Sequence, residues 1–136
     1  IIILVWISSY SIFLLNYRKN CIRAFIKKIM NKENLNEWYF VSDTKGIELE
    51  DIIRFDHDNK TYCVYSLEGG YYATDGICTH ESVHLEDGLV MDDEIECPMH
   101  QGIFNIKTGK AISPPACNDL KTYPIKVENE KIYIKI

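Results

Sequence analysis

The chain has 136 residues, with 15 Lys and Arg, 20 Asp and Glu, and a formal net charge of −5. This length suits one domain. Residues 30–136 hold all 20 acidic side chains, whereas residues 1–29 hold none. The acidic part is not expected to bind nucleic acid, because phosphate backbones require a basic face. Its acidity either keeps the domain soluble or favours docking on a basic protein surface.

Residues 1–29 form an apolar and basic extension. Residues 1–15 are uncharged and mostly apolar, which is short of the roughly 20 residues that a membrane span needs. The basic residues follow the apolar run, whereas a secretory signal places them before it. Three interpretations are open: translated sequence upstream of a start at Met30, a truncated membrane anchor with a basic flank, or an amphipathic helix packed on the domain. The first two predict a cytoplasmic location for residues 30–136.

From Trp38 onward the sequence predicts short strands separated by turns. Many short strands with frequent turns favour an all-β fold, either a sandwich or a small barrel. Only residues 22–37 have much helical character. The turn-prone residues 57–60 are expected to join the second and third strands as a hairpin. The expected strands are Trp38–Val41, Ile52–Asp56, Thr61–Ser66, Tyr71–Thr74, Leu89–Met91, Glu94–Cys97, Ile103–Ile106, Lys110–Ile112, Lys121–Val127 and Lys131–Ile136.

The five cysteines do not form a framework of regularly spaced pairs. Their odd number and irregular spacing favour reduced intracellular thiols over a secreted disulfide scaffold. Cys63 lies in an apolar strand pattern and is expected to be a small core residue. Cys117 follows two prolines and an alanine, and we assign it no ligand role.

Two short segments each supply one thiol and one imidazole. They are Cys78-Thr79-His80 and Cys97-Pro98-Met99-His100, and each follows an expected strand and enters a loop. Two cysteines and two histidines are the ligands of a Rieske [2Fe–2S] centre, in which two histidines replace two cysteines on one iron. The same residue types also form tetrahedral zinc sites. The alternating order differs from common zinc spacing, in which like ligands are paired.

The segment from Cys78 to Cys117 closely resembles the Rieske ferredoxins that serve bacterial ring-hydroxylating oxygenase systems. The resemblance extends more weakly over residues 36–136 and covers nothing before Met30. It implies a β-sandwich base that carries a smaller cluster-binding lobe, over about residues 76–116. The matching segments are Cys78-Thr79-His80, Leu85-Glu86-Asp87-Gly88, Ile95-Glu96-Cys97-Pro98-Met99-His100-Gln101-Gly102, Phe104-Asn105, Thr108-Gly109-Lys110, Pro114-Pro115-Ala116 and Leu120-Lys121-Thr122-Tyr123.

The resemblance also implies the roles of individual residues around one [2Fe–2S] cluster per chain. Cys78 and Cys97 would bind the inner iron, and His80 and His100 would bind the outer, exposed iron. The segment Pro114-Pro115 would shield the cluster. The exposed imidazole edges would be the route by which electrons enter and leave.

Other histidines and acidic residues near these loops receive different expectations. The pattern assigns no ligand role to His84, which we expect to be solvated in a loop, and His57 is expected to be exposed in a hairpin turn. Glu81, Glu86 and Asp87 lie near the loops, where they either help to dock a basic partner or are only solvated.

Four positions depart from the Rieske proteins of respiratory complexes. Val83 and Met99 occupy the positions of the two cysteines that form a disulfide in those proteins. Gly102 and Phe104 occupy the positions of a serine and a tyrosine whose hydroxyls lie near the cluster sulfurs. Hydrogen bonds to sulfur stabilise the reduced cluster, so their loss predicts a potential of about −150 mV, at the low end of the Rieske range.

The resemblance implies a soluble, low-potential one-electron carrier between an NAD(P)H-dependent flavin reductase and a terminal oxygenase. The sequence has no Rossmann glycine fingerprint and no additional 2-His-1-carboxylate iron site, so catalysis is expected in the partners. Membrane contact is expected only if residues 1–29 are a real anchor.

Three alternative functions are open. The first is the small Rieske subunit of a nitrite-reductase-like complex, although relatives of that kind often lose ligands and all four are present here. The second is a fragment of an oxygenase large subunit, which is disfavoured because the sequence ends on an ordinary strand, Lys131–Ile136. The third is a zinc-bound or cluster-free β domain used for interaction, which the colour of the purified protein would distinguish.

Overall fold

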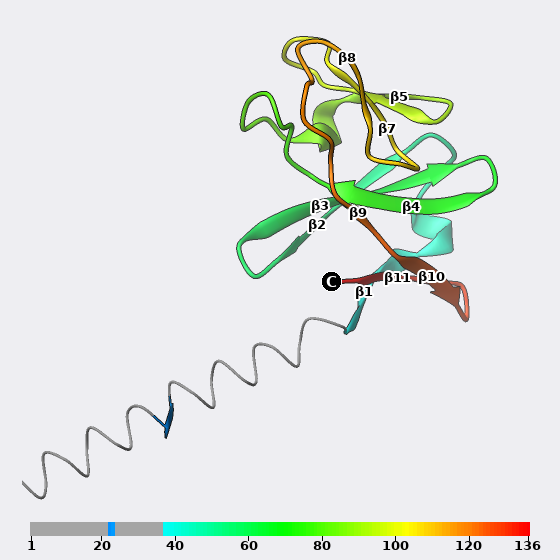
Figure 1. The fold of residues 1–136 in the computed structure, drawn as a ribbon. Coiled ribbons are helices and arrows are strands. Elements are labelled where there is room, and N and C mark those ends of the chain that lie inside the picture. Colours follow the sequence, from blue (N-terminus) through cyan, green and yellow to red (C-terminus); the bar gives the residue numbers. More distant parts are fainter. Residues whose placement is uncertain (1–21, 24–36) are drawn as a thin grey trace, which may run out of the picture. The chain divides into compact units, whose positions relative to one another are not determined.

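The computed structural model describes residues 22–23 and 37–136, of which Trp38–Ile136 form one compact unit (Figure 1). Of the helix expected over residues 22–37, the structure describes only Ile22 and Arg23, which are helical, and Glu37, which is not. The interpretations of residues 1–29 likewise concern residues outside the described part. No helix among the described residues is long and apolar enough to cross a membrane.

The compact unit consists of three antiparallel sheets, which confirms the predicted all-β class. The outer sheet contains β1 (Trp38–Asp43), β11 (Lys131–Lys135) and β10 (Ile125–Glu128), in that order. The central sheet contains β2 (Ile52–His57), β3 (Lys60–Leu67), β4 (Gly70–Asp75) and β9 (Thr122–Tyr123). The lobe sheet contains β5 (Leu89–Met91), β6 (Glu94–Glu96), β7 (Ile103–Asn105) and β8 (Ala111–Ser113), and the 3₁₀ turns are η2 (Thr44–Gly46) and η3 (Leu85–Asp87).

The hairpin predicted between the second and third strands is confirmed as β2 and β3. His57 pairs with Lys60, so a two-residue turn joins the strands. Asp58 and Asn59 fill this turn with φ angles of 47° and 60°. Two left-handed residues match the right-handed twist of the flanking strands, and Asn and Asp adopt this conformation more readily than most residues.

The single strand predicted over Lys121–Val127 is wrong, because the structure interrupts it at Pro124. β9 precedes the proline and pairs with β4 of the central sheet, whereas β10 follows it and pairs with β11 of the outer sheet. Proline has no amide hydrogen and cannot continue a ladder of hydrogen bonds. The Pro124 carbonyl still accepts a hydrogen bond from the Lys135 amide at 2.9 Å. The chain therefore passes from one sheet to the other at this residue.

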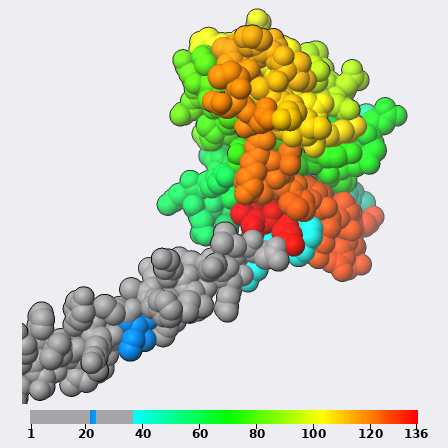
Figure 2. Space-filling model, in the orientation of Figure 1, coloured from blue at the N-terminus to red at the C-terminus, as the bar shows by residue number. Residues whose placement is uncertain are grey.

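Strand β3 contributes to two hydrophobic cores. Cys63, Tyr65 and Leu67 belong to the core shared with the lobe, and the prediction that Cys63 is a core residue is confirmed. Tyr62 and Val64 point the opposite way, into the core shared with the outer sheet. Alternate residues of a strand project to opposite faces. The central sheet therefore lies between the lobe, at the top of Figures 1 and 2, and the outer sheet.

We predict that Ile132→Ala destabilises the protein by about 2–5 kcal/mol, because it leaves a cavity in a close-packed core. Ile132 is fully buried on β11 and packs in the core with Val64 and Ile134. The free energy of unfolding can be measured by urea denaturation. The matched control is Val127→Ala on the neighbouring strand β10, where the side chain is 49% exposed. An equal loss of stability in both variants would contradict this assignment of the core.

Candidate metal centre

The first ligand loop leaves the central sheet after β4 and is closed by backbone hydrogen bonds. The amide of Cys78 donates to the carbonyl of Val83 at 2.8 Å. Behind it, the amide of Leu85 donates to the carbonyl of Gly76 at 2.9 Å, and Ile77 forms a bridge with His84. The two ends of the loop are thereby held together, with His80 exposed between them.

The second ligand loop connects β6 to β7 and is closed in the same way. The amide of Cys97 donates to the carbonyl of Gly102 at 2.8 Å, which again lies five residues further along the chain. The amide of Gln101 donates back to the carbonyl of Cys97 at 3.2 Å, and Gln101 has a φ of 59°. His100 is exposed in this loop. The two loops therefore present a cysteine at the base and a histidine further out.

The two thiols lie together in the core beneath the loops. Cys78 and Cys97 are only 5% and 3% exposed, and a side-chain hydrogen bond joins them. Burial raises the pKa of the Cys97 thiol, while backbone hydrogen bonds from Met99 and His100 act in the opposite direction. Amides that point at this sulfur favour its thiolate, which is the form that binds metal.

The two imidazoles lie together at the surface. The ring centroids of His80 and His100 are 5.0 Å apart, and the ring planes are nearly perpendicular, at 84°. One ligand atom from each of His80, Glu81 and His100 falls within 4.8 Å of the others. The Glu81 carboxylate lies 4.0 Å from Nδ1 of His100. The structure therefore brings all four predicted ligands into two pairs, with the thiols buried and the imidazoles exposed.

This arrangement fits a [2Fe–2S] group of Rieske type. Such a group needs two thiolates on one iron and two imidazoles on the other. The buried sulfurs lie among apolar side chains that exclude water, whereas the imidazole edges reach the surface. The donor set, its pairing and its burial are all compatible with that group.

The segment after β8 packs against both ligand loops. A Cβ atom on Gly102 would lie only 3.1 Å from the Cβ of Ala116, so the second loop approaches this segment closely. The hydroxyl of Thr79 donates to the carbonyl of Asn118 at 2.7 Å, which joins the first loop to it. The bond between Pro114 and Pro115 is cis. A serine at position 102 would therefore require Ala116 to shift.

The expectation that His84 is solvated is wrong, and the expectation that His57 is exposed needs correction. His84 is half-buried beside the first loop, and its Nδ1 has no hydrogen-bond partner among the described residues. His57 is also half-buried, because its ring packs on Tyr39 at 4.2 Å between centroids and stacks with Phe55 at 6.3 Å. The burial of His57 could not be read from local sequence, because its ring packs on Tyr39 of a separate strand, β1.

Sequence reasoning missed Arg54, which joins β2 of the central sheet to η3, the turn that follows the first ligand loop. Its guanidinium donates to Asp56 on the same strand at 2.8 Å and to Glu86 of η3 at 2.7 Å. Glu86, considered as a docking residue, is thus held within the molecule. The pair is separated by 32 positions in the sequence, so no local pattern indicates it. As an exposed ion pair it stabilises the fold only modestly.

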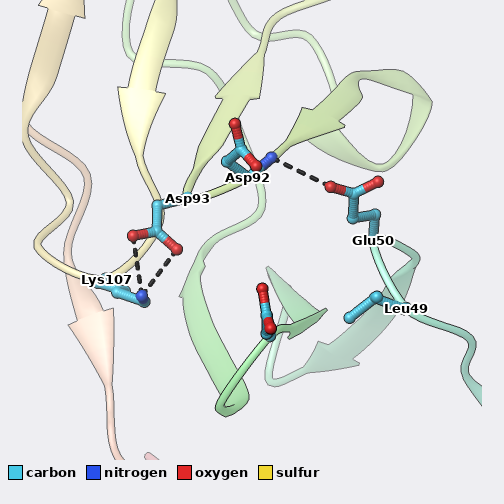
Figure 3. A pocket seen from close by; sticks show the side chains of 6 residues that line it. Leu49, Glu50, Asp92, Asp93 and Lys107 are labelled. Atoms are coloured by element: carbon cyan, nitrogen blue, oxygen red, sulfur yellow. Dashed lines mark hydrogen bonds and ion pairs between the residues drawn. The ribbon is translucent and has the colours of Figure 1, made fainter.

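A hollow of about 380 Å³ lies beside the β5–β6 and β7–β8 turns of the lobe and the β3–β4 turn of the central sheet (Figure 3). None of the four ligands lines it. Lys107 forms an ion pair with Asp93 at 2.7 Å, and the amide of Asp92 donates to Glu50 at 3.2 Å. These contacts join the β7–β8 and β5–β6 turns to each other and to the segment before β2. Carboxylates dominate the lining, which consists of Leu49, Glu50, Glu68, Asp92, Asp93 and Lys107.

A three-sheet β protein whose two loops present buried thiols and exposed imidazoles has the donor set of a Rieske-type [2Fe–2S] protein. The model of the Rieske [2Fe–2S] domain family matches residues 37–124, and the chain belongs to this family. The family carries a [2Fe–2S] cluster, which confirms the predicted cofactor.

Individual relatives agree with this assignment. The chain is 43% identical over 99 residues to the ferredoxin component of the naphthalene 1,2-dioxygenase/salicylate 5-hydroxylase systems of Ralstonia sp., covering 73% of this chain and 95% of that protein. A solved complex of oxygenase and ferredoxin in carbazole 1,9a-dioxygenase contains a chain that matches this one with a TM-score of 0.70 and 30% identity. The match covers 72% of this chain and 92% of that chain. The resemblance to Rieske ferredoxins of dioxygenase systems is thereby confirmed.

A nitrite reductase subunit shares the fold at lower identity. It is described as the small subunit of an NADH-dependent nitrite reductase from Mycobacterium tuberculosis. It matches with a TM-score of 0.67 and 15% identity, over 74% of this chain and 96% of that chain. This similarity concerns the fold alone.

Proposed function

We propose that Cys78, His80, Cys97 and His100 hold one [2Fe–2S] cluster, and that the protein carries single electrons to the terminal oxygenase of a ring-hydroxylating system. The observation that carries the proposal is the division of the donor set, with both thiols buried and both imidazoles exposed. When bound, the cluster supplies reversible one-electron transfer. The exposed rings of His80 and His100 give a partner close access to that group.

The chain's own residues set the conditions for this transfer. The Met99 and His100 amides hydrogen bond to the Cys97 sulfur and stabilise negative charge there. The buried core around Cys78 and Cys97 excludes water from the inner side. The closed loops fix the positions of all four donors, so that little rearrangement accompanies transfer. Such a site suits a carrier, and the chemistry on an organic substrate would occur in the oxygenase.

The relatives support the choice of partners. The Ralstonia protein is the ferredoxin component of dioxygenase systems, and the similar carbazole dioxygenase chain occurs in a complex of ferredoxin with oxygenase. An NAD(P)H-dependent flavin reductase is the donor that such a carrier requires, and the cytoplasm is where its nicotinamide substrate is available. The excess of acidic residues after position 30 favours basic surfaces on both partners.

The nitrite-reductase alternative has less support. Its structural relative shares only 15% identity, whereas the Ralstonia ferredoxin shares 43% along nearly its whole length. No contact in the described part of the chain favours that function over electron transfer to an oxygenase.

The ligand assignment predicts different effects for neighbouring histidines. His100→Ala and Cys97→Ser should abolish the Rieske-type electron paramagnetic resonance signal, because each removes a donor to iron. His84→Gln serves as the matched control, since His84 lies beside the same site without belonging to either pair. The signal of dithionite-reduced protein and its iron content provide the measurement. A normal signal in His100→Ala would refute the assignment.

The redox potential is expected to be about −150 mV, because neither Gly102 nor Phe104 offers a hydroxyl to a cluster sulfur. Phe104 is fully buried in the core that contains both ligand cysteines. Phe104→Tyr should therefore raise the potential, whereas Phe55→Tyr in the other core should leave it unchanged. An anaerobic redox titration, followed by electron paramagnetic resonance, measures the potentials of the two variants. A strongly positive potential in the unmodified protein would contradict this explanation.

The function itself is tested by anaerobic mixing of the reduced protein with an oxidised terminal oxygenase. The oxygenase used is that of the naphthalene 1,2-dioxygenase/salicylate 5-hydroxylase systems of Ralstonia sp.. We expect rapid reoxidation, followed in the visible spectrum by stopped flow, with transfer slowing as salt screens the charges between the partners. Adding NADH and a flavin reductase then tests the donor. Reduced protein that retains its cluster and yet fails to reduce the oxygenase would overturn the proposed function.

A further inference from the structure

Among the described residues, no other sheet covers the second face of the outer sheet. Ile132 and Ile134 of β11 are fully buried against the central sheet, so Lys131, Tyr133 and Lys135 project from the opposite face. Residues that pair across antiparallel strands share a face. Trp38 pairs with Lys135, and Phe40 and Lys126 both pair with Tyr133. These residues form the aromatic–lysine face: Trp38, Phe40, Lys126, Lys131, Tyr133 and Lys135.

Lysines and aromatic rings alternate closely on this face. The ammonium group of Lys126 lies 5.0 Å from the ring centroid of Trp38 and 5.2 Å from that of Tyr133. Lys135 lies 5.9 Å from Trp38, and Lys131 lies 5.7 Å from Phe40. Cation–π contacts of this length hold each lysine against a ring. Trp38 and Phe40 nevertheless remain 37% and 49% exposed.

The charge of this face differs in sign from that of the domain. Its three lysines are accompanied by two acidic residues. Glu128 forms an ion pair with Lys126 at 3.2 Å, and Asp43 lies opposite Lys131 in the register of the strands. Cations therefore outnumber anions here, although acids predominate over residues 30–136 as a whole. A partner attracted to this face is anionic.

The combination of residues distinguishes between kinds of anionic partner. Protein interfaces are depleted in lysine, whereas membrane–water interfaces are enriched in tryptophan and tyrosine and accommodate long lysine side chains. Exposed Trp38 and Phe40 can enter the headgroup region, while the lysines remain at the phosphate level. The chemistry of the face therefore fits an anionic lipid surface better than an acidic protein.

The preceding sequence has the same character. Residues 1–15 are uncharged and mostly apolar, and five cations lie between positions 18 and 28. The chain from position 29 to Trp38 can span at most about 30 Å when fully extended. If the apolar segment enters a bilayer, the aromatic–lysine face is kept within reach of the same surface. Such tethering strengthens weak contacts by raising their effective concentration.

We propose that the aromatic–lysine face docks on an anionic phospholipid surface. The lysine ammonium groups contact lipid phosphates, and Trp38 and Phe40 insert among the headgroups. The central sheet separates this face from the lobe, so His80 and His100 remain accessible to redox partners while the base is docked.

The test uses the cluster-loaded full chain with Trp6→Phe, which leaves Trp38 as its only tryptophan. We expect cosedimentation with vesicles containing equal parts of phosphatidylcholine and phosphatidylglycerol, and little with phosphatidylcholine alone. Lipids brominated near the headgroup should quench the fluorescence of Trp38. In this background, Lys131→Glu combined with Lys135→Glu should weaken binding at least about tenfold and reduce the quenching.

The matched control is Lys107→Glu combined with Lys110→Glu, which makes the same charge change at the β7–β8 turn of the lobe. This variant should retain clearly more binding and Trp38 quenching than the sheet variant, since the lobe does not face the lipid. Equal losses in the two pairs would refute the proposal, because a general charge effect would then explain them. Binding without quenching of Trp38 would also refute it, since residues 1–29 alone would then hold the protein to the vesicle.

Discussion

Strand β3 is buried on both faces, and the remaining architecture is arranged around it. Cys63, Tyr65 and Leu67 pack towards the lobe, while Tyr62 and Val64 pack towards the outer sheet. Removing this apolar area from water on two sides is the main favourable term in assembling the three layers. The same packing fixes the floor beneath the ligand loops, because the lobe-facing core includes Cys78 and Cys97.

The two ligand loops solve the same geometric problem in the same way. In each, the cysteine amide donates to a carbonyl five residues later, which brings the ends together and projects the intervening histidine outward. The thiols remain in the dry core and the imidazoles reach solvent. The segment around Ala116 then packs against the second loop and is joined to the first through Thr79. The donors are thus held by backbone contacts from three parts of the lobe.

This layered arrangement gives the molecule two surfaces of different character. The lobe presents the paired histidines, which suit brief contacts with redox partners, within a domain rich in acidic residues. The opposite sheet presents lysines interleaved with aromatic rings, which suit a lipid headgroup region. Because the central sheet lies between them, contact at one surface leaves the other free.

The sequence by itself determined the all-β class, most strand positions and the four candidate donors, because these features depend on local periodicity and on the order of Cys and His. It did not reveal that the chain changes sheets at Pro124, since the pairing partners of β9 and β10 lie far away in sequence. The packing of His57 on Tyr39 and the bond from Arg54 to Glu86 were hidden for the same reason. Tertiary structure alone decided these features, because each arises where segments distant in the sequence come into contact.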